Sequence, residues 1–487
     1  MRYRNDPEGT RLPIKLDTTT NGEFAPIPLA PVHHRARRLA LDTATTNARR
    51  LNLPRRGFLV SACGAATALL AMNAAYASAG RRGGYYDLPT AAALDAQLAR
   101  SELDRGEFVF DVQGHFVSPT GAWTRALPPG AQPLKGFTDL RGCAAESAPG
   151  LGYLQCLGAD AFVKDVFLDS DTDLVVLSFV PSTRKGEPLT IEEAAATAKI
   201  VERMEGTHRM LLHGRVNPNQ AGDLEGMDEL AARYPIAAWK TYTQWGPDGK
   251  GFFLDDDVGV TMIEKGRKLG IRNVAVHKGL PFGPQSYAHS TCVDIGRVAK
   301  RYPDVNFLVY HSGFVAGKPE GPYDPRSTEG IDVLITSLRE NGIRPGANVY
   351  AELGSTWRFL MRDPDSAAHA LGKLFKYVGE DNVLWGTDSI WYGSPQDQIQ
   401  AFRVFQISDA LAEKHGYPKI TPALRAKVFG RNALRVYAIS EDVLKKHLVA
   451  DNVAGERLAY RERADPSFLT YGPKTRREFL NLKAWGG

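Results

Sequence analysis

The chain has 487 residues, of which 43% are hydrophobic and 24% are charged, values typical of a globular protein with a large apolar core. Its net charge of +5 is unevenly distributed. Residues 1–79 contain eleven basic and five acidic residues, so the rest of the chain carries a net charge near −1. This balance argues against a basic surface of the kind that binds nucleic acid or an anionic membrane.

The first 54 residues are polar, rich in Thr, Arg and Pro, and show no hydrophobic periodicity. A segment of this composition buries too little apolar surface to offset the entropy lost on folding. Residues 1–54 are therefore predicted to form a disordered extension.

An export signal is predicted over residues 55–79. Arg55 and Arg56 precede a mildly apolar, Ala-rich run over 60–72, and small residues follow it. This order resembles a twin-arginine signal, which implies a periplasmic or secreted protein. The run is shorter than the ~20 residues of a membrane span, so we expect no stable membrane insertion of the mature protein. An uncleaved membrane helix and, because of Cys63, a lipoprotein cleavage site are the alternatives.

Residues 80–106 are predicted to lead into the main domain, with helical spacing between 90 and 103. The domain is predicted to span 107–440 and to be followed by a charged C-terminal extension, 441–487, that wraps around its outside. Within it, eight short apolar runs alternate with stretches of helical pattern. These runs span 107–112, 174–180, 210–216, 236–241, 273–277, 306–310, 348–353 and 383–386.

Eight such units predict an α/β fold, a (β/α)₈ TIM barrel of parallel strands with right-handed crossovers. An open, doubly wound sheet is the structural alternative, although no glycine-rich phosphate turn follows the first strand. The long gap at 118–170 predicts an insertion after strand 1, which we expect to lie over the barrel as a lid or a substrate wall. Cys143 and Cys156 in this gap form a disulfide or remain as buried thiols.

Several of the apolar runs end in a polar or metal-binding residue, where a barrel presents its chemistry. Gln113 and His115 are two apart on one strand and so point the same way. His277, His311 and Asp388 each follow an apolar run. Because burying such groups without partners is costly, a divalent ion shared by His115, His277 and Asp388 is one solution, and a metal-free polar cluster is the other.

The order of these motifs over about 107–440 resembles the amidohydrolase superfamily, in its one-metal branch of the aminocarboxymuconate-semialdehyde decarboxylase type. That branch carries Asp-x-His-x-His on strand 1, one histidine after each of strands 5 and 6, and an aspartate after strand 8. The corresponding residues here are Asp111-Val112-Gln113-Gly114-His115, His277, His311 and Gly386-Thr387-Asp388, and Gly430–Tyr437 resembles the closing Gly-x-Asn-Ala stretch.

The resemblance implies that His115, His277 and Asp388 bind one divalent ion, Zn²⁺ first and Mn²⁺ second. It also implies that His311 and Asp388 are the catalytic proton-transfer groups for a metal-activated water. Gln113 departs from the pattern because it stands at the first histidine position. We expect it to be a weaker, assisting metal ligand, since an amide oxygen binds Zn²⁺ less well than imidazole does.

Lys240 and Glu352 also end apolar runs, and we expect them to contact the substrate or to pair with each other beside the site. The leading hypothesis is a metal-dependent hydrolase of a small-molecule amide, lactone or related bond. The alternatives are a metal-dependent decarboxylase of a small carboxylic acid and a metal-free binding protein that has lost catalysis. The expected partner is a small-molecule substrate and not a nucleic acid; whether the chain forms a homo-oligomer is left open.

Overall fold

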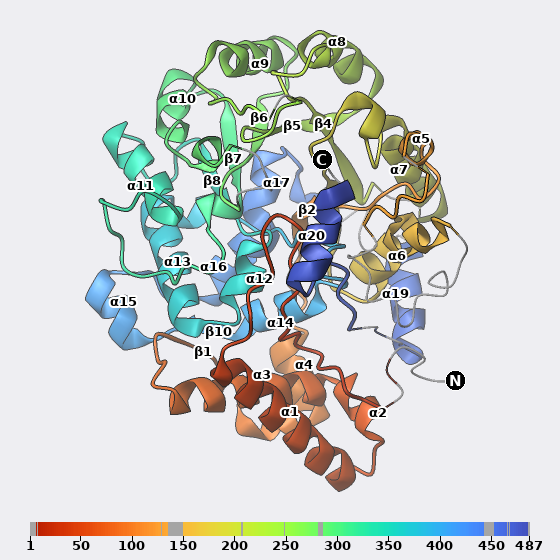
Figure 1. Cartoon of the computed structure of the whole chain (residues 1–487). Coiled ribbons are helices and arrows are strands. Elements are labelled where there is room, and N and C mark those ends of the chain that lie inside the picture. The colour runs from red at the N-terminus through yellow and green to blue at the C-terminus, as the bar shows by residue number, and fades with distance from the viewer. Residues whose placement is uncertain are drawn as a thin grey trace.

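Eight parallel strands form the centre of the computed structural model (Figure 1). The structure describes residues 6, 8–127, 129–134, 150–205, 208–247, 249–280, 286–442, 452–464, 466 and 468–485. The strands are β2 (Phe110–Gly114), β3 (Leu174–Leu177), β4 (Met210–Arg215), β5 (Ile236–Tyr242), β6 (Asn273–His277), β7 (Asn306–Tyr310), β8 (Val349–Glu352) and β9 (Val383–Leu384). Each lies close to one of the eight predicted runs.

The strands follow one another around the sheet in chain order, from β2 to β9. The two edges meet, because the backbone N–H of Val112 donates to the carbonyl of Trp385 at 3.0 Å and Gly114 forms a parallel bridge with Ser389. The result is a nearly closed (β/α)₈ barrel, which confirms the predicted fold. This closure also brings the residues after β9 beside those at the end of β2.

Helices surround the barrel, and most of the longer ones present an apolar stripe to the strands and a charged face to solvent. They are α7 (Ile191–Glu205), α8 (Asp223–Arg233), α9 (Asp257–Lys268), α10 (Ile295–Arg301), α11 (Ile331–Glu340), α12 (Thr356–Leu360), α13 (Pro364–Tyr377), α14 (Gln396–Val404), α15 (Asp409–His415), α16 (Pro422–Ala426) and α17 (Asn432–Val436). In the insertion after β2, the described part contains α5 (Ala122–Arg125) and α6 (Ala159–Val163). Cys143 lies outside the described residues.

The N-terminal extension contains a long helix where the sequence analysis expected disorder. Helix α1 (Pro31–Arg50) packs against α3 (Ala62–Ser78), with α2 (Arg55–Leu59) between them in the chain. The prediction of disorder is therefore wrong for α1. The buried face of this helix is a stripe of alanines four residues apart, each at most 2% exposed: Ala36, Ala40, Ala44 and Ala48. Four small side chains among arginines give little hydropathy signal, but they allow two helices to approach closely.

Helix α3 belongs to the same apolar core as the barrel helices, with Leu69 and Ala75 fully buried. It contacts α4 (Ala96–Leu103) and α14, so residues of the predicted export signal are integrated into the fold. Whether they also direct export remains a prediction. Among the described residues, no helix combines the length and apolarity that a membrane crossing requires.

Two terminal segments pass over the barrel mouth. The N-terminal arm, defined here as residues 11–29, crosses the centre of the barrel before α1 begins, beside the C-terminal helix α20 (Arg476–Trp485) (Figure 1). The stretch before α20 joins the arm, because Thr20 donates its N–H to the carbonyl of Pro473 at 3.0 Å. Helix α19 (Asn452–Glu462) packs against α7. Strand β1 (Gly84–Tyr86) pairs with β10 (Phe405–Ile407) in a separate ribbon.

Candidate active site

All of the predicted site residues lie in the C-terminal half of a barrel strand or just after its end. They are at most 2% exposed and comprise Gln113, His115, Lys240, His277, His311, Glu352 and Asp388. The hydrophobic strands bring them together because parallel strands end at a common rim. The polar cluster is thus enclosed by the arm above it and by the packed barrel interior below it.

The backbone at this rim is unusual. His311, Ser355 and Asp388 have positive φ values of 64°, 55° and 61°. Residues other than glycine adopt this region at a cost that the surrounding structure must offset, and they concentrate at functional sites. The strand ends therefore turn sharply to direct these side chains into the mouth.

Asp111 fixes the junction between β2 and the segment after β9. Its carboxylate accepts hydrogen bonds from the backbone N–H groups of Gln113 and Thr387, both at 3.0 Å, and from the Thr387 hydroxyl. Burial raises the pKa of Asp111 to about 7, against the opposing effect of these donors. Asp111 is therefore a structural clamp that sets the position of Asp388.

Asp388 is the hub of the cluster. Its Oδ1 lies 3.0 Å from Gln113 Nε2 and 3.1 Å from His115 Nε2. Its Oδ2 accepts from Ser355 Oγ at 2.6 Å and from Asn21 Nδ2 at 2.8 Å. Burial acts to raise the pKa of Asp388, but its neighbours, with His115 first and Ser355 among them, together outweigh burial and hold that pKa well below its usual range. Asp388 is therefore an ionised carboxylate, as a metal ligand must be.

Each of the three histidines uses one ring nitrogen to bond a backbone carbonyl. His115 Nδ1 lies 3.1 Å from the Ser178 oxygen, and His311 Nδ1 lies 2.6 Å from the Gly354 oxygen. His277 Nε2 is similarly 3.3 Å from the carbonyl of Leu280. Because a carbonyl only accepts, these contacts require a hydrogen on each of those nitrogens.

The second nitrogen of each ring faces the centre of the mouth. Burial lowers the pKa of His277 well below its ordinary value and that of His311 to about 4, so both rings are neutral near pH 7. Their inward nitrogens then carry lone pairs rather than hydrogens. Metal-binding histidines have this arrangement, in which the outer nitrogen donates to a carbonyl and the inner one ligates. The ring nitrogens of His277 and His311 therefore fit a divalent cation.

Gln113 occupies the position predicted for it, between the other groups. Its Nε2 lies 3.4 Å from His115 Nε2 and 3.5 Å from His311 Nε2, in addition to its contact with Asp388. Its Oε1 is buried and has no hydrogen-bond partner among the described residues. A half-turn of the amide would exchange the two atoms and direct the oxygen to the centre, where it fits a cation better than it fits its present place.

Lys240 and Glu352 lie beside the cluster, but they do not form the direct pair that the sequence analysis considered. Lys240 Nζ lies 3.7 Å from the centre of the Tyr310 ring and 4.8 Å from that of Tyr242. Within the described part of the chain, no acceptor bonds to this nitrogen. Glu352 instead accepts from the backbone N–H groups of His311 at 3.0 Å and Gly354 at 2.5 Å. Burial lowers the pKa of Lys240 and raises that of Glu352.

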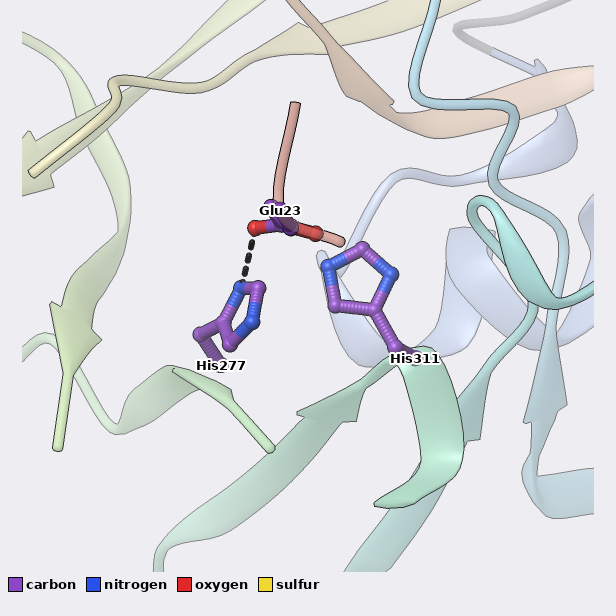
Figure 2. A group of neighbouring side chains, drawn as sticks. All are labelled: Glu23, His277 and His311. Atoms are coloured by element: carbon purple, nitrogen blue, oxygen red, sulfur yellow. Dashed lines mark ion pairs between the residues drawn. The ribbon is translucent and has the colours of Figure 1, made fainter. Parts of the chain in front are cut away.

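The site also contains residues that the sequence analysis did not identify. Glu23, from the N-terminal arm, lies between His277 and His311 (Figure 2). One potential ligand atom from each of these three residues lies within 4.8 Å of the others. Asn21 and Ser355 contact Asp388 directly. No sequence signal pointed to the arm, since it lacks both an apolar run and a motif, whereas Ser355 follows the strand that ends in Glu352.

A family model described as Amidohydrolase matches residues 165–439. A search of curated proteins gives no match. Among solved structures, 5-carboxyvanillate decarboxylase from Sphingomonas paucimobilis is 13% identical, with a TM-score of 0.43, covering 68% of this chain and 99% of that one.

Two further structures are similar at the same level. A dihydroxybenzoic acid decarboxylase from Polaromonas sp. JS666, with bound manganese and an inhibitor, is 14% identical; the TM-score is 0.42 and the coverage is 69% of this chain and 99% of that one. An amidohydrolase from Mycobacterium avium subsp. paratuberculosis is 16% identical; the TM-score is 0.39 and the coverage is 69% and 98%.

Proposed function

Because the chain belongs to the amidohydrolase family, we propose that it is a metal-dependent enzyme that hydrolyses an amide, lactone or related bond of a small molecule at the barrel mouth. The observation that carries the proposal is the arrangement of the three histidines. Each donates one N–H to a backbone carbonyl and directs its other nitrogen toward buried carboxylates or Gln113. A divalent ion is the simplest group that such an arrangement accommodates.

The residues proposed to hold this ion are Gln113, His115, His277 and Asp388. When bound, Zn²⁺ or Mn²⁺ would supply Lewis acidity toward a substrate oxygen or a water. The donor set combines imidazole nitrogens with carboxylate and amide oxygens, which suits both ions. Gln113 shifts the metal preference of the site toward the harder ion, Mn²⁺, because it places an amide oxygen where a ring nitrogen was expected.

His311 is proposed as the proton-transfer group. The Gly354 carbonyl fixes its hydrogen on Nδ1, so Nε2 is free to accept a proton at the centre of the mouth. Because burial lowers its pKa to about 4, the ring starts in the neutral form that a general base requires. Asp388 Oδ1 is close to the same centre and would share the proton.

A decarboxylase is the second candidate, and Lys240 favours it. This lysine is buried at the mouth without a carboxylate within ion-pair distance among the described residues. A substrate carboxylate would supply the missing counter-charge. Glu23 indicates that a carboxylate can be accommodated beside His277, at 3.4 Å. A small carboxylic acid is therefore a reasonable substrate for either reaction.

The proposal is tested by loading the purified full-length chain with Mn²⁺ or Zn²⁺ and screening small lactones, amides and aromatic carboxylic acids. We expect turnover that requires the ion and consumes water without releasing carbon dioxide. Carbon dioxide release without water consumption would show that the protein is a decarboxylase and not a hydrolase. If the chain neither retains an ion nor turns over any compound, a metal-free binding protein is the better description.

A further inference from the structure

We propose that Glu23 of the N-terminal arm is a ligand of the metal centre, so that a segment outside the barrel completes the site. This inference rests on the proposed function, because it concerns the same ion. It adds a ligand that the barrel itself does not provide.

The arm is held firmly enough to place a ligand. Lys15 forms a buried ion pair with Asp397 at 3.3 Å and donates to the carbonyl of Tyr392 at 2.8 Å. Asp17 forms an ion pair with Arg358 at 2.8 Å, and the fully buried Ile14 adds an apolar contact to the core. These contacts fix the part of the arm that precedes Glu23 in the chain. The arm is therefore an ordered part of the barrel mouth.

Glu23 points into the mouth and away from solvent, with 7% of its surface exposed. Its Oε1 lies 3.4 Å from His277 Nδ1, the inward nitrogen of that ring. A carboxylate oxygen and an imidazole lone pair repel each other at this distance unless a cation or a proton lies between them. Asn21 bridges the carboxylates of Glu23 and Asp388 through its side-chain nitrogen, which keeps the two acids on the same centre.

Glu23 also offsets the departure at Gln113. An amide brings a neutral oxygen where an imidazole nitrogen was expected. Among the described barrel residues, Asp388 is the carboxylate that contacts a histidine ring of the site, that of His115 at 3.1 Å. A second carboxylate restores affinity through charge and shifts the preference toward oxygen-binding ions such as Mn²⁺. The same side chain would otherwise only obstruct the mouth, and the experiment separates these two roles.

The test is calorimetric titration of Mn²⁺ into the metal-stripped, full-length chain and into Glu23→Gln. Gln is isosteric and removes only the charge. We expect the dissociation constant to rise by about 10- to 100-fold or more, the range seen when groups supporting a metal site are changed. Glu23→Asp keeps the charge and should recover part of the affinity. The matched control is Glu8→Gln, which removes a charge from an exposed residue just before the arm and should leave the affinity unchanged.

Limited proteolysis of the arm gives a second readout that does not depend on activity. Because coupling between two binding events is reciprocal, Mn²⁺ should protect the arm from cleavage in the unaltered chain and should protect it less in Glu23→Gln. Equal Mn²⁺ affinity in Glu23→Gln and the unaltered chain, with faster turnover in the variant, would overturn the inference and identify Glu23 as an obstruction. Failure of the unaltered chain to bind Mn²⁺ or Zn²⁺ would overturn the proposed function as well, so the two failures are distinguishable.

Discussion

The barrel strands and the N-terminal segment are both deeply buried, yet they differ in how they reach that state. A strand such as β7 contains a run of four large, mainly apolar residues, Phe307–Tyr310, in which Leu308 is fully buried. Helix α1 instead buries alanines between arginines, and the arm buries Lys15, Asn21 and Glu23 through polar contacts. Hydropathy reports the first kind of burial and misses the second. In this molecule, the second kind reaches into the active site.

The largest expected effect concerns export, which is all or none. We propose that Arg55→Lys combined with Arg56→Lys keeps the protein in the compartment where it is made, because a twin-arginine signal requires the pair. Cell fractionation and the intact mass of the exported form measure this. The Glu23 proposal requires an exported form that keeps residues 1–79, since cleavage after residue 79 would remove the arm. An unchanged location would make the signal prediction wrong.

Arg56 also contributes to packing. It is buried beneath the Phe468 ring, 4.5 Å from the ring centre, and it forms an ion pair with Asp6 at 3.7 Å. Its replacement therefore also tests packing. Arg55→Lys alone is the better-tolerated change, since the contacts that Arg55 makes are to the Glu8 carbonyl at the surface. Unfolding temperatures of both variants separate an export defect from a folding defect.

The variant His311→Asn tests the proton-transfer role proposed for a residue of the barrel. We expect kcat to fall by about 10²- to 10⁴-fold, the usual contribution of general acid–base catalysis, while the bound metal is retained. Steady-state kinetics and metal analysis of the same preparation measure this. His208→Asn is the control, because His208 is exposed at the protein surface. Unchanged kcat in His311→Asn would remove this residue from the mechanism.

The claim that α3 is as integral as the barrel is tested by a matched pair of cavities. Leu69 in α3 and Leu308 in β7 are both fully buried. Replacing either by Ala should lower the free energy of unfolding by about 2–5 kcal/mol. Urea unfolding of the two variants measures this. A much smaller loss for Leu69→Ala than for Leu308→Ala would show that the N-terminal helices contribute little to the fold.

The smallest expected effect is the pH dependence of the arm. Burial acts to raise the pKa of Asp17, but the charges of Arg358 and Lys474 and the hydrogen bonds from Thr19 together outweigh it and lower that pKa from 3.8 to about 2. A carboxyl with a lowered folded-state pKa contributes stability above its unfolded pKa and loses it as pH falls. The arm should therefore loosen progressively between about pH 4 and pH 2.

Hydrogen exchange of residues 11–29 across that pH range measures the loosening. Asp17→Asn should remove the pH step and cost about 1–2 kcal/mol at pH 7, since a hydrogen-bonded charge is lost while Arg358 stays buried. An arm that exchanges equally at pH 5 and pH 2.5 in the unaltered chain would contradict this role of Asp17.

The sequence was informative where local pattern and function coincide. His277 follows three apolar residues and His311 follows four, so their place at strand ends could be read directly, as could Asp388 from its Gly-Thr context. Glu23 could not be found this way. It lies in a segment without periodicity, and only the tertiary fold brings it to His277. Helix α1 was missed for a related reason. Its buried face consists of alanines, which pack closely but give little hydropathy signal because their apolar area is small.

The central claim is that the barrel mouth binds one divalent ion through His115, His277 and Asp388. Its most direct test is elemental analysis of the full-length chain after loading and dialysis, alongside Asp388→Asn. The account expects close to one ion per chain in the unaltered protein and a large loss in the variant, whose amide cannot supply the charge. Equal metal content in the two proteins, or none in either, would contradict it.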